Sequence, residues 1–345
     1  MIIRICAFTK TGWEQVSTIE NKFTEHIFER RTSNITLQDW VGEAFGMKSP
    51  LIFIGAVGIA VRAIASFVTD KLTDSPVIVI DENAKYVIPI LSSHVGGAAL
   101  LARELALRLG AEVVITTSTD VHSLFSVDSF AVKNGLEIIN RDGIRKVSTK
   151  LLDEGSVKIS VAPGIQILND EIPRELRLVD YISDSNEGTE EEPLADIIIS
   201  YEESDVSRAG ILLRPREYIL GIGCKKGTSE DRIRSAVKDV LKGSNLSMRE
   251  IAAIASIDLK SKEYGLVLYA QKEKKPLITY SADLLASVEG EFSESSFVKS
   301  VTGVSNVCER AAVCYAGQGA EVIIPKHAVD GVTVAVVRRN VLLRF

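Results

Sequence analysis

Short runs of β-branched and other apolar residues constrain the fold of this chain more than any other feature. Four such runs punctuate its first third: IIRICAF (2–8), LIFI (51–54), VIVI (77–80) and VVITT (113–117). They do not alternate with polar residues, which is typical of strands buried on both faces. Helical patterns separate them, and similar runs return near the C-terminus. The sequence therefore predicts an α/β fold of layered parallel or mixed sheets with helices.

The clearest predicted helix covers residues 97–109. Leu101, Leu105 and Leu109 recur every four residues and form one apolar face, while charged residues occupy the other side. Gly110 follows the last leucine, where a glycine commonly ends a helix. A helix between two strands is the pattern expected of a βαβ unit.

The segment 51–68, LIFIGAVGIAVRAIASFV, approaches the length of a membrane span. It begins after Pro50, carries Arg62 at its centre and is interrupted by Gly55 and Gly58. We therefore expect a strand, a loop and a buried helix here, and no membrane contact.

Two shifts in composition predict how the 345 residues divide into domains. The stretch from Asp180 to Asp205, both included, has ten acidic residues and no Lys or Arg, which favours a solvated loop or domain edge. A proline-containing linker then leads into a new strand. We predict an N-terminal α/β domain (1–125) and a C-terminal α/β domain (218–345), joined by a central region (126–217).

Charge and cysteine content limit the possible partners. A net charge of −6 disfavours nucleic-acid binding, which needs a basic surface. The four cysteines form neither a disulfide framework nor a zinc signature, and the four histidines are too dispersed to predict a metal site. The apolar run at the N-terminus is too short for a signal peptide. A reducing cytoplasm is the simplest expectation.

The turn SSHVGGA (92–98) contains the first candidate site. Gly96 and Gly97 allow the backbone to approach a ligand without a Cβ in the way. His94 beside such amides could be a general acid or base, with the amides holding an oxyanion. The alternative is a structural histidine in a turn.

Other loops at predicted strand ends could line one mouth with His94. They include the glycine loop before Arg62, Asp81 after VIVI, and Asp120 after VVITT. Asp81 or Asp120 could then orient the imidazole. The alternative is that both are ordinary turn residues.

The stretch LGIGCKKGTSEDRI contains the second candidate site. Its glycines have the spacing G-x-G-x-x-x-G, which matches neither nucleotide-binding fingerprint and argues against a nucleotide-binding protein. What remains is an anion-binding turn with Lys225 and Lys226 beside a helix start that Thr228 could cap. The alternative is a tight turn with solvated lysines.

Seven segments, in order, closely resemble the CbiG family, the cobalt-precorrin-5A hydrolases of anaerobic cobalamin biosynthesis. They are LIFIGAVGIAVRAIA, DKLTDSPVIVIDENAKYVIPILSSHVGGA, VITTSTD, LGIGCKKGTSEDRI, IAAIASIDLK, VTGVSNVCERAA and IIPKHAVDGVTVAVV. The resemblance implies hydrolysis of the ring A δ-lactone of a cobalt tetrapyrrole with release of acetaldehyde. Cobalt then belongs to the substrate, so no cofactor and no metal site of the protein's own are expected. Neighbouring cobalamin-pathway enzymes are the implied protein partners.

On this resemblance, His94 is the general acid/base, and the Gly96 and Gly97 amides are oxyanion donors. Members of the family often have Asn where this chain has Ala99, so a contact made by that Asn would need a substitute such as Ser93.

The resemblance also assigns a group of residues to substrate binding, in which the lysines and the glycine turn hold the substrate carboxylates. They are Arg62, Gly223, Lys225, Lys226, Gly227, Thr228, Glu309 and Arg310, the last two divided evenly between structure and site. Cys224 and Cys308 are expected to be small buried residues. The C-terminal region resembles a CobE/CbiG-like unit that also occurs alone, so a non-catalytic corrinoid-intermediate binding or carrier protein is the alternative function.

Overall fold

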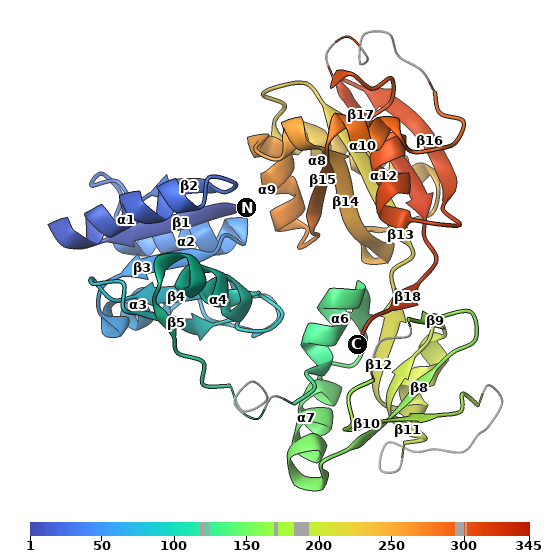
Figure 1. Cartoon of the computed structure of the whole chain (residues 1–345), viewed down its shortest axis with the longest axis horizontal. Helices are drawn as coiled ribbons and strands as arrows, with labels where there is room; N and C mark the ends of the chain where they lie inside the picture. The colour runs from blue at the N-terminus through green and yellow to red at the C-terminus, as the bar shows by residue number, and fades with distance from the viewer. Residues whose placement is uncertain (118–121, 123, 169–171, 183–192, 294–299, 301) are drawn as a thin grey trace.

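The computed structural model describes residues 1–117, 122, 124–168, 172–182, 193–293, 300 and 302–345. Three helix-covered sheets follow one another along the described chain (Figure 1). We name them with their helices the N-terminal unit (1–117), the central unit (124–217) and the C-terminal unit (218–338). The α/β fold predicted from the sequence is confirmed.

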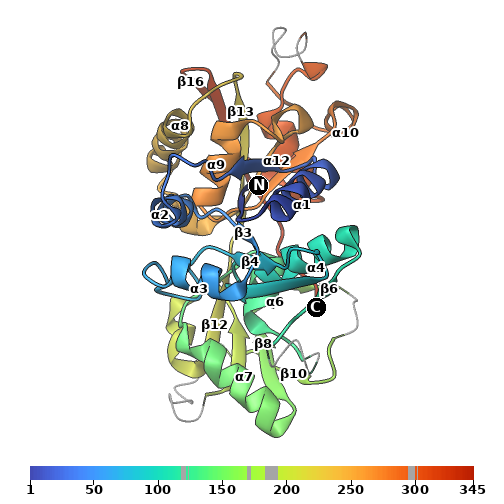
Figure 2. The same ribbon diagram turned by 90° about the vertical axis from the view of Figure 1, so that its left-hand side faces the viewer.

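The N-terminal sheet has six strands in the order β2-β1-β3-β4-β5-β6. These are β1 Ile2–Ala7, β2 Ile27–Arg30, β3 Leu51–Ile54, β4 Val77–Ile80, β5 Tyr86–Leu91 and β6 Glu112–Val113. Two helices cover each face (Figure 2): α1 Lys10–Lys22 and α4 Ala98–Leu109 on one, α2 Leu37–Met47 and α3 Val57–Ile64 on the other. The predicted strand, loop and helix over 51–68 are confirmed.

The sequence analysis did not predict strand β5, whose direction decides where His94 lies. It pairs antiparallel to β4, with Pro89 opposite Ile78, whereas β1, β3 and β4 run parallel. Proline has no N–H and disfavours a strand interior, so Pro89 hides this strand in the sequence. After β5 the chain is therefore back at the amino edge of the sheet, where β3 and β4 begin at Leu51 and Val77. The opposite edge, where they end, is the carboxyl edge.

The central sheet has the order β10-β8-β11-β12-β7. Its strands are β7 Leu136–Ile138, β8 Val157–Val161, β10 Leu176–Val179, β11 Ala195–Ile199 and β12 Ala209–Pro215. Helices α6 Val127–Asn134 and α7 Asp142–Glu154 pack on it. The end of the chain returns here, because β18 Leu342–Leu343 pairs with β9 Gln166–Ile167. We propose domain boundaries near 125 and 217 that follow the sheets, with residues 339–345 added to the central unit.

The C-terminal sheet has the order β15-β14-β13-β17-β16. Its strands are β13 Tyr218–Cys224, β14 Ile251–Ile257, β15 Leu277–Tyr280, β16 Glu321–Val329 and β17 Val332–Arg338. Helices α8 Glu230–Gly243 and α9 Tyr264–Lys272 cover one face, and α10 Ala282–Ala286 and α12 Cys308–Ala316 the other.

The amino edge of the N-terminal sheet faces the other two units (Figure 1). The Gln271 side chain of α9 accepts a hydrogen bond from the Ile2 amide at 3.0 Å and donates one to the Ser49 hydroxyl at 2.8 Å. Arg141 of the central unit forms an ion pair with Asp70 at 2.9 Å. Among the described helices, none has the length and apolar character needed to cross a bilayer.

Candidate active site

The antiparallel direction of β5 separates loops that the sequence analysis placed at one mouth. Gly55 and Asp81 follow β3 and β4, so they lie at the carboxyl edge. His94 follows β5 and lies at the amino edge, where the neighbouring Ser92 hydroxyl donates to the carbonyl oxygen of Asp74 at 3.1 Å. The prediction of one shared mouth is wrong for the Gly55 and Asp81 loops, because it assumed that all these strands were parallel. Strand β6 runs parallel to β5, so residues 114–117 leave the sheet at the same edge as His94.

Asp81 closes the β4–β5 hairpin and does not orient His94. Its carboxylate accepts hydrogen bonds from the backbone N–H groups of Tyr86 at 2.5 Å and Asn83 at 3.2 Å. These are the contacts of an ordinary turn aspartate. Asp120, the other acid predicted to orient the imidazole, lies outside the described residues.

Arg62 also belongs to the carboxyl side of the sheet. It is exposed on α3, and its guanidinium lies back over Gly58, at the first turn of that helix. The structure therefore does not bring Arg62 to the edge that holds His94.

Backbone hydrogen bonds shape the turn around His94 and use one of the predicted oxyanion donors. The Gly97 amide, at a φ of 82°, donates to the His94 carbonyl oxygen at 3.0 Å. This corrects the prediction for Gly97, because its N–H already has an acceptor. The Gly96 amide has no acceptor among the described residues. A Cβ on Gly96 would lie 2.5 Å from the Ser92 Cβ, so the turn needs glycine there.

The His94 ring reaches the start of α6 in the central unit. Its Nδ1 lies 3.1 Å from the Ser129 Oγ and 3.3 Å from the Ser126 Oγ. The Asp128 carboxylate, only 8% exposed, accepts from the Ser126 hydroxyl at 2.5 Å and from the Ser129 amide at 3.0 Å. The sequence analysis missed these three residues, because serine and aspartate at a helix start are the ordinary signature of an N-cap.

The glycine turn after β13 uses most of its polar groups internally. The Gly227 amide donates to the Glu263 carboxylate at 2.7 Å, and the Lys225 amide donates to the Gly331 carbonyl oxygen at 3.1 Å. The Thr228 hydroxyl donates to the Lys225 carbonyl oxygen at 2.8 Å. Thr228 is therefore not the N-cap that the sequence predicted: α8 begins two residues later, at Glu230.

The exposed groups of this turn are the side chains of Lys225 and Lys226. This turn lies at the end of β13 that points away from the central unit, because the strand register puts Cys224 opposite Val332, while Tyr218 lies opposite Arg338 at the end that leads to the central unit. Gly223 is needed here, since a Cβ would lie 2.5 Å from the Thr333 Oγ1. The structure does not bring the two predicted sites together.

Glu309 and Arg310 both have structural partners. The Glu309 carboxylate, 2% exposed, accepts from the Asn306 side chain at 2.7 Å and from the Lys326 amide at 2.5 Å. The Arg310 guanidinium donates to the Val288 carbonyl oxygen at 2.7 Å, beyond the end of α10. The sequence left open whether these two residues have a structural role or belong to the substrate site, and these contacts favour the structural role.

The surroundings of Cys224 and Cys308 do not favour a nucleophilic thiolate. Burial raises the pKa of the Cys308 thiol to about 11, and the pKa of the Cys224 thiol to about 11 as well. A thiol needs its thiolate form to attack, so both are poor nucleophiles at neutral pH.

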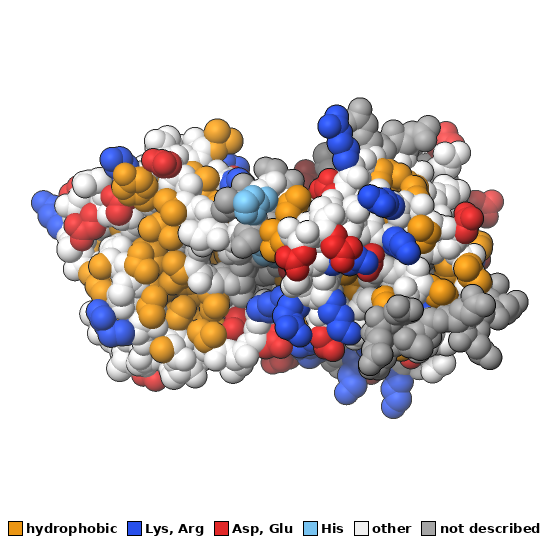
Figure 3. Space-filling view, turned by 90° about the horizontal axis from the view of Figure 1, so that it is seen from below, with side chains coloured by type: hydrophobic (Ala, Val, Ile, Leu, Met, Phe, Trp, Pro, Cys, Tyr) orange, Lys and Arg blue, Asp and Glu red, His pale blue; other side chains and the backbone are white. Residues whose placement is uncertain are grey.

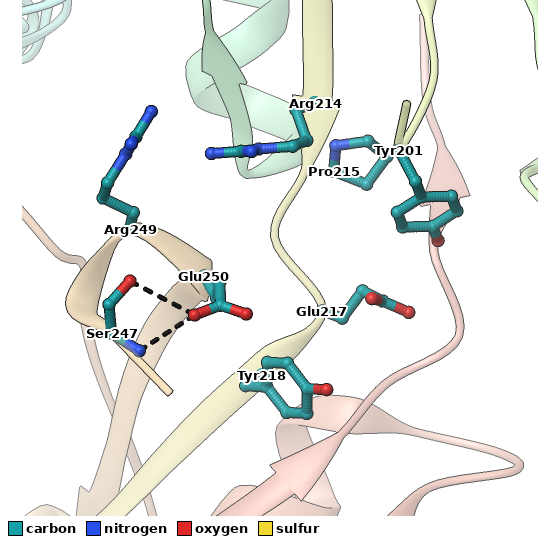
Figure 4. A pocket seen from close by; sticks show the side chains of 8 residues that line it. All are labelled: Tyr201, Arg214, Pro215, Glu217, Tyr218, Ser247, Arg249 and Glu250. Atoms are coloured by element: carbon teal, nitrogen blue, oxygen red, sulfur yellow. Dashed lines mark hydrogen bonds between the residues drawn. The ribbon is translucent and has the colours of Figure 1, made fainter. Parts of the chain in front are cut away.

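A cavity of about 370 Å³ lies between the central and C-terminal units (Figure 4). None of the predicted site residues lines it. Burial raises the pKa of its Glu217 carboxyl group above the usual range. The lining residues are Tyr201, Arg214, Pro215, Glu217, Tyr218, Ser247, Arg249 and Glu250.

Apolar side chains gather on the surface of the N-terminal unit, whereas charged side chains cover more of the other units in the same view (Figure 3). Exposed apolar residues of this unit include Val61 on α3 and Leu100 and Leu107 on α4. No group of three or more potential metal ligands occurs among the described residues.

The boundary between the N-terminal and central units thus holds an imidazole, two hydroxyls and a buried carboxylate, which together define a candidate acid–base site in an α/β protein. The chain belongs to the CbiG family. Two family descriptions match it: Cobalamin synthesis G N-terminal over residues 39–120, and Cobalamin synthesis G C-terminus over residues 218–337. This confirms the resemblance found in the sequence.

Relatives with this family's name match most of the chain. The cobalt-precorrin-5A hydrolase of Priestia megaterium is 32% identical over 294 residues, 83% of this chain and 77% of the relative. The cobalt-precorrin-5A hydrolase of Salmonella typhimurium is 33% identical over 272 residues, 78% of this chain and 77% of the relative. A crystal structure of a cobalamin biosynthesis protein G homologue from Sulfolobus solfataricus covers 98% of this chain and 96% of its own, with 23% identity and a TM-score of 0.43.

Proposed function

We propose that this protein is a cobalt-precorrin-5A hydrolase, which opens the ring A δ-lactone of a cobalt tetrapyrrole and releases acetaldehyde. The observation that carries the proposal is the similarity to two relatives with this name. They are 32% and 33% identical to this chain over 83% and 78% of its length. The four free cysteines suit the reducing cytoplasm in which we place the reaction. We expect neighbouring enzymes of the cobalamin pathway to supply the substrate and take the product.

In this proposal His94 moves the protons. It takes a proton from the water that attacks the lactone carbonyl carbon, and the Gly96 amide donates to the oxygen that becomes negative. The ring C–O bond of the lactone then breaks, leaving a carboxylate and a free hydroxyl group. Loss of acetaldehyde removes the proton of that hydroxyl, breaks the carbon–carbon bond and adds a proton to the ring carbon left behind.

In this proposal Lys225 and Lys226 bind carboxylates of the substrate. Both side chains are exposed at the end of β13, and ammonium groups attract carboxylates. The Gly227 amide and the Thr228 hydroxyl already donate to groups of the protein. We therefore assign these two residues to the shape of the turn that presents the lysines. Capture and chemistry are thus assigned to different units.

The experiment is an anaerobic incubation of the purified protein with cobalt-precorrin-5A. Trapped aldehyde and the mass of the tetrapyrrole are measured together. Acetaldehyde with the matching loss of mass supports the hydrolase. Tetrapyrrole binding without any change in mass overturns it in favour of a corrinoid-intermediate carrier.

A further inference from the structure

The residues behind the His94 ring form a series of hydrogen-bonded groups that ends in the Asp128 carboxylate. Asp128 is buried at the start of α6, and the nearest hydroxyl to its carboxylate is that of Ser126, at 2.5 Å. The same Ser126 Oγ lies 3.0 Å from the Ser129 Oγ and 3.3 Å from the His94 Nδ1. Imidazole, hydroxyl and carboxylate therefore follow one another across the boundary between two units.

The proton inventory gives this chain a direction. A hydroxyl has one proton to donate, and an ionised carboxylate can only accept. Hydrogen bonds to charged acceptors are stronger than those to neutral ones, so Ser126 donates its proton to Asp128. Its oxygen then accepts a hydrogen bond from the side of the imidazole. The His94 Nδ1, 3.3 Å away, then serves as the donor to Ser126 or to the neighbouring Ser129.

We propose that Ser126 and Asp128 are positioning residues for His94. They hold the proton on Nδ1, which makes Nε2 the nitrogen that exchanges protons with the substrate. When Nε2 takes a proton, the Asp128 charge stabilises the imidazolium through the Ser126 hydroxyl. This role rests on the proposed function, in which His94 is the acid/base. It gives the central unit a part in the reaction.

Helix capping alone would also place a serine and an aspartate here, and the chain contains a matched control for that role. Ser281 is the N-cap of α10, its hydroxyl accepts from the Leu284 amide at 3.3 Å, and Asp283 lies two residues after the serine. The same Ser-x-Asp pattern starts α6, where Ser126 is the N-cap. Among the described residues no histidine contacts the α10 start, so α10 serves as the control for capping alone.

The test is ¹⁵N NMR of the full chain labelled at its four histidines, combined with turnover of cobalt-precorrin-5A. His94→Gln assigns the His94 signals. We expect neutral His94 to carry its proton on Nδ1, and Asp128→Asn and Ser126→Gly to move that proton toward Nε2. Both variants lower kcat roughly tenfold or more with KM unchanged, and Ser126→Thr restores both readouts. Glycine retains most N-cap stability, so Ser126→Gly tests the proposal even where Asp128→Asn does not fold.

Asp283→Asn and Ser281→Gly are the controls, and we expect neither to change the His94 signals or kcat. The proposal is overturned when His94 carries its proton on Nε2 in the unmodified protein, or when Ser126→Gly leaves tautomer and kcat unchanged. Failure of the proposed function looks different: the unmodified protein then releases no acetaldehyde, whatever the tautomer of His94.

Discussion

The two glycine-rich turns of this protein have similar sequences and different surroundings. Each follows a strand and precedes a helix, and each carries a basic side chain, His94 in one and Lys225 with Lys226 in the other. The first turn follows β5 and directs its side chain to another unit. The second follows β13, which like β5 has one parallel and one antiparallel neighbour, and its lysines are exposed to solvent.

This difference teaches that a glycine-rich turn gains its chemistry from what faces it. At the first turn, Ser129 and the Asp128 network lie behind the imidazole. At the second turn, the Gly227 amide already donates a hydrogen bond to the Glu263 carboxylate of the same chain. We therefore assign proton transfer to the first turn and carboxylate capture to the second.

The largest expected effect is on the stability of the second turn's unit. A Cβ on Gly221 of β13 would lie 1.8 Å from the Cys308 carbonyl oxygen of α12, so Gly221→Ala forces the helix off the sheet. We expect a loss of about 3 kcal/mol or more in the free energy of unfolding, measured by circular dichroism in urea. Gly243→Ala is the control, since nothing lies within 4 Å of a Cβ there. Equal stability of the two variants would contradict this packing.

At the first turn, an added methyl group should affect catalysis more than folding. Gly96→Ala puts a Cβ 2.8 Å from the Ser92 carbonyl oxygen and displaces the His94 turn. We expect kcat for acetaldehyde release to fall about 100-fold, because small displacements of an acid–base group are costly. Gly46→Ala in α2, where a Cβ meets nothing within 4 Å, should keep full activity. Full activity of Gly96→Ala would remove the His94 turn from the site.

Removing the lysines should weaken capture and leave the chemistry intact. We expect the double variant Lys225→Ala/Lys226→Ala to raise KM about tenfold with kcat unchanged, because the lysines act in capturing the substrate carboxylates and lie away from the His94 turn. Lys238→Ala, exposed on α8, is the control. A fall in kcat at unchanged KM would assign the lysines to the chemistry instead.

The smallest effect concerns acid stability of the N-terminal unit. Burial, aided by the N-terminal ammonium group, lowers the pKa of His26 to about 4. The unfolded chain, with an ordinary pKa near 6.5, therefore binds more protons between these values, and stability falls as the pH drops from about 6.5 to 4.

We expect His26→Gln to remove about 1 kcal/mol of this acid-induced loss, a value reduced for the partial exposure of the ring. Trp13 and Trp40 are the chain's two tryptophans and both lie in the N-terminal unit, so their fluorescence in urea at pH 7 and pH 4.5 follows that unit. His327→Gln, exposed in the C-terminal unit, is the control. An unchanged pH dependence in His26→Gln would contradict the burial argument.

Much of the fold could be predicted from apolar runs, but strand β5 and the strands of the central sheet were not predicted. The strands at 51–54 and 77–80 and the helix over residues 98–109 agree with the sequence pattern, because burial on both faces leaves a continuous apolar run. Strand β5 contains Pro89 and partly exposed positions, which obscured it. Because this strand was omitted, His94 was expected at the carboxyl edge beside Asp81, whereas it lies at the amino edge.

The partners of the candidate site could not be predicted at all. His94 and the glycines around it were visible as a turn, but Ser126, Asp128 and Ser129 belong to another unit and look like a helix cap. Contacts between units depend on how sheets pack against one another, which local patterns do not contain. The role of Glu309 was likewise left open by the sequence. Its contacts with Asn306 and Lys326, which depend on the fold, favour a structural role.

The most direct test of the central claim compares His94→Ala with the Lys225→Ala/Lys226→Ala variant in one experiment. Binding of cobalt-precorrin-5A and single-turnover release of acetaldehyde at saturating protein are measured anaerobically for both. The account predicts that His94→Ala binds the tetrapyrrole and releases no acetaldehyde, while the lysine variant binds weakly and turns over at the normal rate once saturated. Normal turnover by His94→Ala, with turnover lost in the saturated lysine variant, would contradict it.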